Sequence, residues 1–327
     1  MTNVNSSDKC ALVLGASGGI GGEVLRQLKA NGWQVSALSR RQDSQTETKD
    51  EITWLRGDAM NSKDVLRAAR GCQVIVHAVN PPGYRHWAEQ VLPMVDNTIA
   101  AAIAEKATIV LPGTVYNYGF DAFPLIAEDA PQNPQTRKGR IRVQMEQRLQ
   151  DATTQGARVI VVRAGDFFGP RAGNNWFSQA LVKPNQPLKK VSRPGKLGIG
   201  HQWAFLPDVA RTMVTLIHQR NSLPSFARFH MEGHWDADGT QMTAAICRVA
   251  RQHGLHPKVS AFPWWQTKLL ASLIPTLREM QEMRYLWDRP LRLNGNLLKA
   301  AIGHEPHTPL DEAVELTLKG MGCIASD

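Results

Sequence analysis

The chain has 327 residues, 43% of them hydrophobic, and its 38 Lys and Arg against 29 Asp and Glu give a formal net charge of +9. That length suits one large α/β domain, or such a domain with a smaller lobe. No run of about 18 apolar residues exists, which excludes a transmembrane helix, and the basic residues form no stripe. We therefore expect neither a membrane nor a nucleic acid as partner.

The termini and cysteines bear on the compartment. Residues 1–9 are polar and lack the apolar segment of a secretory signal. The four cysteines, at positions 10, 72, 247 and 323, show no CxxC spacing. Buried thiols in a reducing compartment explain them better than disulfides or a metal site, so we expect a cytoplasmic protein and predict no metal.

Strand and helix signals alternate through the first two thirds of the chain. Apolar runs predict strands at 10–15, 33–39, 52–55, 72–79, 108–112 and 157–163. Helices are predicted at 20–31, 62–70, 86–105 and 139–155, the first ending at Asn31-Gly32 and the second capped by Ser62. This order is typical of an α/β fold with a doubly wound parallel sheet, the Rossmann fold.

A glycine cluster directly follows the first expected strand. Its glycines satisfy both GxxGxxG and GxxxGxG spacing and are Gly15, Gly18, Gly19 and Gly21. Glycines let the backbone approach a pyrophosphate closely, and the helix that begins near Ile20 directs its N–H groups and positive dipole end at that charge. We interpret the segment, with Ser17, as a dinucleotide phosphate site; a plain glycine turn is the alternative.

The end of the second strand distinguishes two cofactors. An acidic residue there accepts a hydrogen bond from the ribose 2′-hydroxyl of NAD, but the sequence reads Ser39-Arg40-Arg41. A guanidinium can bind a 2′-phosphate, so we favour NADP over NAD. Asp58, followed by Ala59, either accepts from the adenine amino group or is a turn aspartate before a helix.

The pattern becomes less regular beyond residue 165. A helix at 207–219 and a strand at 226–231 are predicted. We expect a dinucleotide-binding core of residues 1–165, completed by about 204–232. Residues 166–203 and 233–327 are expected to form a smaller, mainly helical substrate-binding lobe over the cofactor cleft.

An apolar stripe at helical spacing marks the lobe. It contains Trp264, Trp265, Leu269, Leu270, Leu273 and Ile274, and Met280, Met283, Leu286 and Trp287 continue it. We interpret the stripe as the lobe's own core. A substrate lid, a subunit contact and a membrane-surface helix are the alternatives.

Further motifs follow the expected strands in a fixed order. They are Gly57-Asp58, His77-Ala78-Val79-Asn80, Thr114–Gly119, Arg163–Pro170, Leu206–Ala210 and Thr308–Ala313. With the glycine cluster, these motifs resemble an atypical or extended member of the short-chain dehydrogenase/reductase superfamily, in the NAD-dependent epimerase/dehydratase family. The resemblance covers most of the chain.

The resemblance implies roles for several positions. Ala78 and Val79 would line the nicotinamide side of the dinucleotide. Thr114 stands where the family places the Ser or Thr that hydrogen-bonds a substrate carbonyl or hydroxyl. Arg163–Phe168 would carry the chain past the nicotinamide, and Asp208 would hold the lobe against the core.

The helix after the Thr114 strand departs from the family pattern. Family members normally carry Tyr-x-x-x-Lys there, whose tyrosine transfers a proton. By register, Lys138 occupies the tyrosine position and Arg142 the lysine position. Arg142 can hold the ribose, but its pKa is too high for a proton carrier. Lys138 can act as an acid only if its surroundings lower its pKa.

Three other groups are candidates for the proton transfer. Tyr116 and Tyr118 follow Thr114 closely, with packing as the alternative role for each. His201 is a further candidate, although a lone histidine is more often structural. His77 ends a buried strand, and we interpret it as a satisfied core group.

These observations favour an NADP-binding oxidoreductase that acts on a small carbonyl or hydroxyl compound by hydride transfer. Its expected catalytic residues are Thr114, Tyr116, Lys138 and Arg142. The alternative is a non-catalytic NADP-binding sensor, which needs only the dinucleotide pocket. Because members of the superfamily often pair through helices flanking the sheet, a homodimer is a further expectation.

Overall fold

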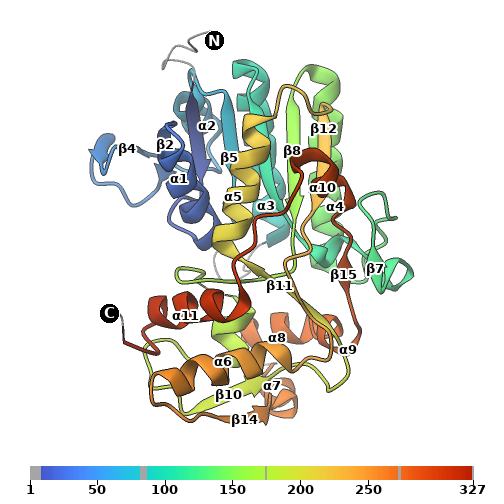
Figure 1. Ribbon diagram of the computed structural model, residues 1–327. Coiled ribbons are helices and arrows are strands. Elements are labelled where there is room, and N and C mark those ends of the chain that lie inside the picture. Colours follow the sequence, from blue (N-terminus) through green and yellow to red (C-terminus); the bar gives the residue numbers. More distant parts are fainter. Residues whose placement is uncertain (1–8, 82–86, 174, 272–273, 326–327) are drawn as a thin grey trace. The chain divides into compact units, whose positions relative to one another are not determined.

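The computed structural model describes residues 9–81, 87–173, 175–271 and 274–325. Residue 86, Leu273 and most of the polar segment 1–9 lie outside the described residues. The chain divides into two compact units (Figure 1). The first contains the described residues up to Asn117, with Arg137–Arg163 and Ala210–Phe229. The second contains Tyr118–Thr136, Ala164–Val209 and the described residues from His230 onward.

The first unit is built on one large sheet with the strand order β12-β8-β6-β5-β1-β2-β4-β3. Its strands are β1 (Cys10–Leu14), β2 (Gln34–Ser39), β3 (Thr46–Lys49), β4 (Ile52–Arg56), β5 (Val74–His77), β6 (Thr108–Gly113), β8 (Arg158–Arg163) and β12 (Phe226–His230). Pairing is parallel from β4 through β2, β1, β5 and β6 to β8. The doubly wound parallel sheet is therefore confirmed.

The edge strand β3 was not expected from the sequence. It runs antiparallel to β4, and all four of its residues are exposed. Strand signals in the sequence come from apolar runs, and Thr46–Lys49 contains none. An exposed polar edge strand leaves no such signal.

Helices cover both faces of this sheet (Figure 1). They are α1 (Gly19–Ala30), α2 (Ser62–Ala69), α3 (Trp87–Glu105), α4 (Arg137–Ala152) and α5 (Leu206–His218). One buried cluster joins α2, α3 and α4 to alternate strand residues such as Leu12, Ile75 and Ile109. On the other face, the Trp33 indole N–H after α1 donates to His218 Nε2 of α5 at 3.2 Å.

The helix boundaries follow the expected signals with one correction. Asn31 ends α1, and Gly32 after it has a φ of +77°. Ser62 does not cap α2, because it is already the first helical residue. The cap is Asn61, whose side-chain oxygen accepts from the backbone N–H of Lys63.

Over its described residues, the second unit contains three small sheets and several short helices. The strand orders are β13-β11-β9, β10-β14 and β15-β7. The strands are β7 (Leu125–Ile126), β9 (Asp166–Phe168), β10 (Lys190–Arg193), β11 (His201–Phe205), β13 (His234–Asp236), β14 (Lys258–Ala261) and β15 (Arg292–Leu293). The helices are α6 (Gln241–Gln252), α7 (Trp264–Leu270), α8 (Pro275–Glu282), α9 (Tyr285–Asp288), α10 (Asn296–Ile302) and α11 (Leu310–Gly320).

Tight helical turns occur in both units. The 3-10 turns are η3 (Val115–Asn117), η4 (Phe120–Ala122) and η5 (Thr153–Gln155), and the π-helical turn is η6 (Phe177–Leu181).

The division of the chain differs from the expected one: residues 204–209 and 230–232 belong to the second unit, and so do residues 118–136. There β7 pairs in parallel with β15, and His230 Nδ1 donates to the Ile126 carbonyl at 3.2 Å. The sequence around β7 contains no local signal that predicts its pairing with β15, because the two strands are far apart in the chain.

The apolar stripe of the second unit splits into two environments. Met280, Met283, Leu286 and Trp287 are buried, as expected for a core. The same interpretation is wrong for α7, where Trp265 is 66% and Leu269 69% exposed. This helix has only seven residues and buries Thr267 instead. Helical spacing alone does not show which face of so short a helix packs inward.

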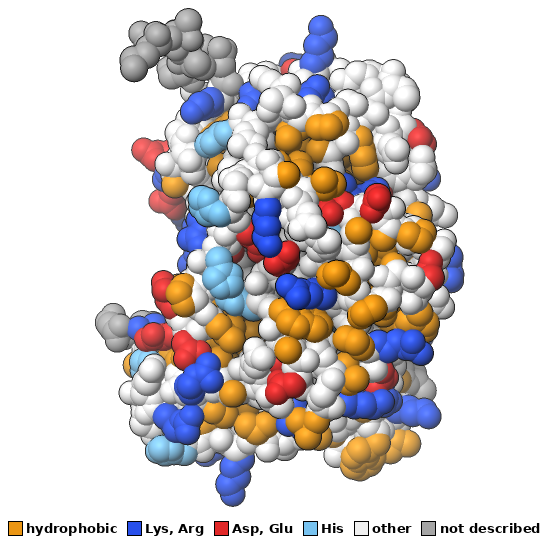
Figure 2. All heavy atoms as spheres, turned by 45° about the vertical axis from the view of Figure 1, so that its right-hand side comes forward, with side chains coloured by type: hydrophobic (Ala, Val, Ile, Leu, Met, Phe, Trp, Pro, Cys, Tyr) orange, Lys and Arg blue, Asp and Glu red, His pale blue; other side chains and the backbone are white. Residues whose placement is uncertain are grey.

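The surface agrees with the even spread of charge in the sequence. Figure 2 shows Lys and Arg side chains scattered over one face among apolar and neutral ones, without a single basic patch. None of the described helices is both long and apolar enough to cross a membrane.

We predict that Gly15→Ala destabilises the protein more than Gly32→Ala does. Both glycines have a positive φ, +88° and +77°. A Cβ at Gly15 would lie 2.5 Å from the Ala78 carbonyl oxygen, whereas nothing lies within 4 Å of one at Gly32. Urea unfolding should show an additional loss of about 1–3 kcal/mol for Gly15→Ala. Equal losses would contradict the close approach of the glycine turn to β5.

Candidate functional site

The glycine turn joins β1 to α1 and packs against the end of β5. The Gly18 N–H donates to the Gly15 carbonyl at 2.9 Å, and a Cβ at Gly21 would lie 2.2 Å from that same oxygen. Gly18 is the N-cap of α1, and no described side chain caps the helix there. Ser17 and Gly18 are exposed, and Gly19 and Ile20 are half-buried. The first backbone N–H groups of α1 therefore lie at an accessible surface, next to a turn whose backbone leaves no space for a Cβ at Gly15 or Gly21.

The residues at the end of β2 and β4 form a second part of this surface. Ser39 Oγ accepts from the Arg41 backbone N–H at 3.2 Å, which turns the chain after β2. Arg40 Nη1 lies 4.0 Å from Asp58 Oδ2, with the Arg40 side chain 65% exposed. Asp58 Oδ1 accepts from the Met60 N–H, as a turn aspartate does, while Ala59 is buried.

A buried ion pair connects strand β8 to helix α4 in the first unit. Arg163 Nη2 of β8 donates to both carboxylate oxygens of Glu146 of α4, each at 2.8 Å. Their side chains are 0% and 3% exposed. Arg228 Nε of β12 lies 3.3 Å from Glu146 Oε2. At this burial the charges are stable only because they neutralise each other.

This ion pair also fixes the turn that contains Thr114. Arg163 Nη1 donates to the Thr114 carbonyl, and Asn117 Nδ2 donates to Glu146 Oε1 at 2.9 Å. The Thr114 hydroxyl donates to Asn117 Oδ1 at 3.3 Å and is half-buried. The Arg163 side chain is thus a buried anchor for the turn, a role that its sequence motif did not indicate.

Helix α4 carries Lys138 and Arg142 one helical turn apart. Lys138 is buried. Arg142 Nη2 donates to Asn80 Oδ1 at 3.4 Å, and its Cζ lies 4.9 Å from the Trp87 ring centroid. Ala78 and Val79, just before Asn80, are half-buried next to the glycine turn. These contacts hold the Arg142 guanidinium at the end of β5.

The tyrosines after Thr114 differ in access. Tyr116 is half-buried. Tyr118 is fully buried in the second unit, where its hydroxyl lies 3.0 Å from His230 Nε2. Because His230 Nδ1 donates to a carbonyl, its Nε2 is the acceptor and the Tyr118 hydroxyl the donor. Tyr118 therefore has a packing and hydrogen-bonding role.

Two further histidines, His77 and His201, have polar side-chain partners. His77 Nδ1 lies 2.8 Å from Thr98 Oγ1, and burial, with the nearby Arg142 charge, lowers its pKa to about 3. It is the satisfied core group that was expected. His201 Nε2 lies 2.8 Å from Asp166 Oδ2, and its ring stacks on Trp287 with centroids 3.7 Å apart. His201, Asp236 and Trp287 line a pocket of the second unit.

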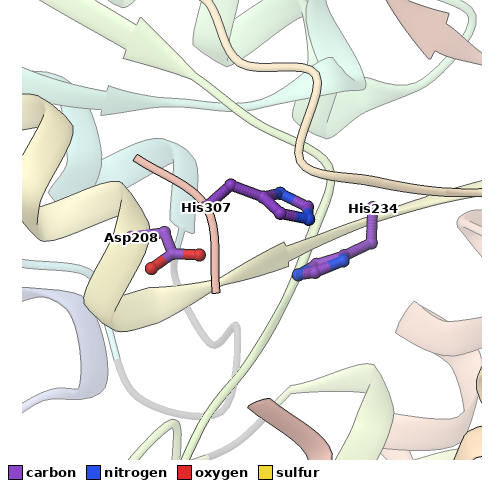
Figure 3. Close-up of side chains that lie close together, drawn as sticks. All are labelled: Asp208, His234 and His307. Atoms are coloured by element: carbon purple, nitrogen blue, oxygen red, sulfur yellow. The ribbon is translucent and has the colours of Figure 1, made fainter. Parts of the chain in front are cut away.

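Asp208 belongs to a cluster that sequence reasoning missed. Its carboxylate accepts from the backbone N–H and the hydroxyl of Thr308, at 2.7 and 2.8 Å. Figure 3 shows Asp208, His234 and His307 pointing toward one another. Burial, with His307 nearby, lowers the pKa of His234 to about 4. These residues are too far apart in the sequence to form a spacing motif.

The model of the NAD dependent epimerase/dehydratase family matches residues 11–231. The chain belongs to this family. Among proteins with a curated description, none matches the sequence.

Solved structures of several enzymes share the fold. UDP-glucuronic acid 4-epimerase from Bacillus cereus, in complex with UDP-glucuronic acid and NAD, has a TM-score of 0.73 at 14% identity, over 95% of this chain and 98% of that chain. UDP-glucose 4-epimerase from Thermotoga maritima, with UDP-glucose, has a TM-score of 0.70 at 14% identity, over 95% and 98%. dTDP-glucose 4,6-dehydratase from Streptomyces venezuelae, with NAD bound, has a TM-score of 0.70 at 16% identity, over 95% and 96%.

We predict that Glu146→Gln lowers the free energy of unfolding by about 3–5 kcal/mol, because it leaves the Arg163 charge buried without its carboxylate. The control is Asp96→Asn, which breaks a surface pair with Arg148 whose side chains are 47% and 43% exposed. The control should cost less than about 1 kcal/mol in urea unfolding. Similar losses in both variants would show that the ion pair is not a major constraint.

Proposed function

We propose that this family member is an NADP-dependent oxidoreductase that acts on a small carbonyl or hydroxyl compound by hydride transfer. The observation that carries the cofactor assignment is the pair Arg40 and Arg41, both exposed, at the end of β2. In this fold the residue at that point meets the adenosine ribose. Two guanidinium groups there favour a 2′-phosphate.

The nearby carboxylate does not cancel this preference. Asp58 Oδ2 lies 4.0 Å from Arg40 Nη1, and the other carboxylate oxygen, Oδ1, accepts a hydrogen bond from the Met60 N–H. An exposed ion pair at that distance contributes little free energy in water. Arg40 can therefore turn from Asp58 to a phosphate at small cost, and Arg41 adds a second positive charge.

The glycine turn fits the pyrophosphate of such a cofactor. Its Gly15 and Gly21 positions leave no space for a Cβ, and the N-terminus of α1 carries no described side-chain cap. Both features expose backbone N–H groups and the positive end of the helix dipole. When bound, the nicotinamide of the cofactor supplies or accepts the hydride.

The remaining roles fall to residues around β5, β6 and α4. We assign the Thr114 hydroxyl to hydrogen-bonding the substrate oxygen, for which its proton turns away from Asn117 Oδ1, its acceptor at 3.3 Å in the structure. The backbone of the turn stays fixed by Arg163, which donates to the Thr114 carbonyl. Arg142, held by Asn80, is assigned to the ribose hydroxyls. The proton for the substrate oxygen comes from Lys138 or from Tyr116.

Alanine substitution of the two arginines tests the cofactor assignment. We predict that Arg40→Ala combined with Arg41→Ala weakens NADPH binding by about 10–100-fold, the effect of losing charged hydrogen bonds to one phosphate. NADH binding should change by less than about 2-fold, because NADH lacks that phosphate. Titrations followed by cofactor fluorescence measure both. Equal losses for the two cofactors would contradict a 2′-phosphate site.

Substitutions near Thr114 test the catalytic assignment. With a panel of aldehydes and ketones, Thr114→Val should lower kcat/KM for NADPH oxidation by about 10–1000-fold through loss of a hydrogen bond to the reacting oxygen. NADPH affinity should stay unchanged. The pH–rate profiles of Lys138→Met and Tyr116→Phe identify the proton donor. Each limb of the profile reports the ionisation of one group, so the limb that belongs to the donor disappears only in the variant that lacks the donor. Lys189→Met, an exposed lysine, is the control.

The same panel separates an enzyme from a sensor. The sensor is favoured by the sequence register inferred above, which puts Lys138 where the family normally has tyrosine. A sensor would bind NADPH and oxidise none of it on any carbonyl, and its partner binding would depend on NADP. That outcome would overturn hydride transfer while leaving the cofactor assignment intact.

A further inference from the structure

Three side chains that can bind a metal converge within the second unit. None of the three is among the residues assigned to the cofactor. Asp208 lies in the first turn of α5, His234 begins β13, and His307 lies between α10 and α11. One ligand atom from each lies within 4.8 Å of the other two. Figure 3 shows the carboxylate and both imidazoles directed toward a common space.

The fold holds these three positions together by backbone pairing. His234 pairs with Trp203 across the antiparallel strands β11 and β13. Strand β11 ends at Phe205 and leads directly into α5, which places Asp208. Both hydrogen bonds from Thr308 to Asp208 fix the backbone next to His307.

His234 carries a polar atom that no described residue satisfies. The residue is 8% exposed, and its Nε2 has no hydrogen-bond partner among the described residues. Its ring lies 4.5 Å from the His307 ring, centroid to centroid, and 5.7 Å from Phe168. A buried ring nitrogen without a partner costs free energy unless a ligand satisfies it. A metal ion between the two imidazoles would do so.

We propose that Asp208, His234 and His307 form a binding site for a divalent transition metal of the Zn²⁺ type. Two imidazoles and one carboxylate are ligands that Zn²⁺ accepts, whereas Mg²⁺ and Ca²⁺ prefer oxygen ligands alone. Three protein ligands leave one tetrahedral position for water. The exposed His307 forms the solvent side of the site.

The distances allow this with a small adjustment. Two ligand atoms bound to one tetrahedral Zn²⁺ through bonds of about 2.0–2.1 Å lie about 3.4 Å apart. The present spread of up to 4.8 Å therefore has to close by up to about 1.4 Å. Small side-chain rotations of the three ligands, with the exposed His307 ring the freest to turn, would supply this movement.

Neighbouring groups orient the ligands, as in known metal sites. Thr308 holds the Asp208 carboxylate through both oxygens. The Glu305 carboxylate accepts from the backbone N–H groups of Glu232 and Gly233, each at 2.7 Å, just before His234. The site would hold the first turn of α5, β13 and the 303–309 segment together within the second unit.

Calorimetric titration tests the proposal on the full-length chain without a polyhistidine tag and after treatment with a chelator. ZnCl₂ should bind with a stoichiometry of one per chain. His307→Ala should weaken binding at least about 10-fold. This exposed substitution leaves the core intact, and circular dichroism verifies the fold. His304→Ala, an exposed histidine of the same segment, should change the affinity by less than about 2-fold.

Cobalt provides an independent readout of the ligand set. Co²⁺ at the same site should give the intense visible absorption of a four-coordinate ion, and His307→Ala should remove it. The proposal is overturned if Zn²⁺ does not bind at unit stoichiometry. It is equally overturned if His307→Ala and His304→Ala bind Zn²⁺ as tightly as the unmodified chain.

Discussion

The buried pair of Arg163 and Glu146 is the constraint on which the rest of the proposed active site depends. A carboxylate from α4 and a guanidinium from β8 lie at 2.8 Å with almost no exposure. Neither charge is stable there alone. Because Arg163 also donates to the Thr114 carbonyl and Glu146 accepts from Asn117, the pair fixes the turn that follows β6. The pair therefore positions a polar turn, and loss of either partner is costly because the other charge stays buried alone.

That constraint connects the cofactor surface to the proposed chemistry. The glycine turn, the end of β5 and the Thr114 turn all lie at the carboxyl ends of parallel strands, where α/β sheets bind ligands. The glycine turn needs only backbone N–H groups, so few side chains specify it. The proposed catalytic residues depend on pairs between separate elements, such as Arg163 with Glu146 and Asn117 with Glu146. Cofactor binding and catalysis are therefore separate questions for this chain.

Local signals predicted what depends on local chemistry. Apolar runs located every parallel strand of the large sheet, and the glycine spacing located the turn at Gly15. The polar edge strand β3 was missed because it carries no apolar pattern, and α7 was misread because its apolar stripe is exposed. The Arg163–Glu146 pair joins β8 to α4 across 17 residues of sequence, and the Asp208, His234 and His307 cluster joins residues that lie farther apart. Only the three-dimensional structure brings such residues together.

Transfer of deuterium from NADPH labelled at the reactive C4 of the nicotinamide tests hydride transfer most directly. Wild-type protein is mixed with the labelled cofactor and a panel of aldehydes and ketones, and the alcohol products are analysed by mass spectrometry. An oxidoreductase of the proposed type gives at least one alcohol with deuterium on the former carbonyl carbon, in proportion to the NADP⁺ formed. Bound NADPH that keeps its label throughout the panel would contradict the account.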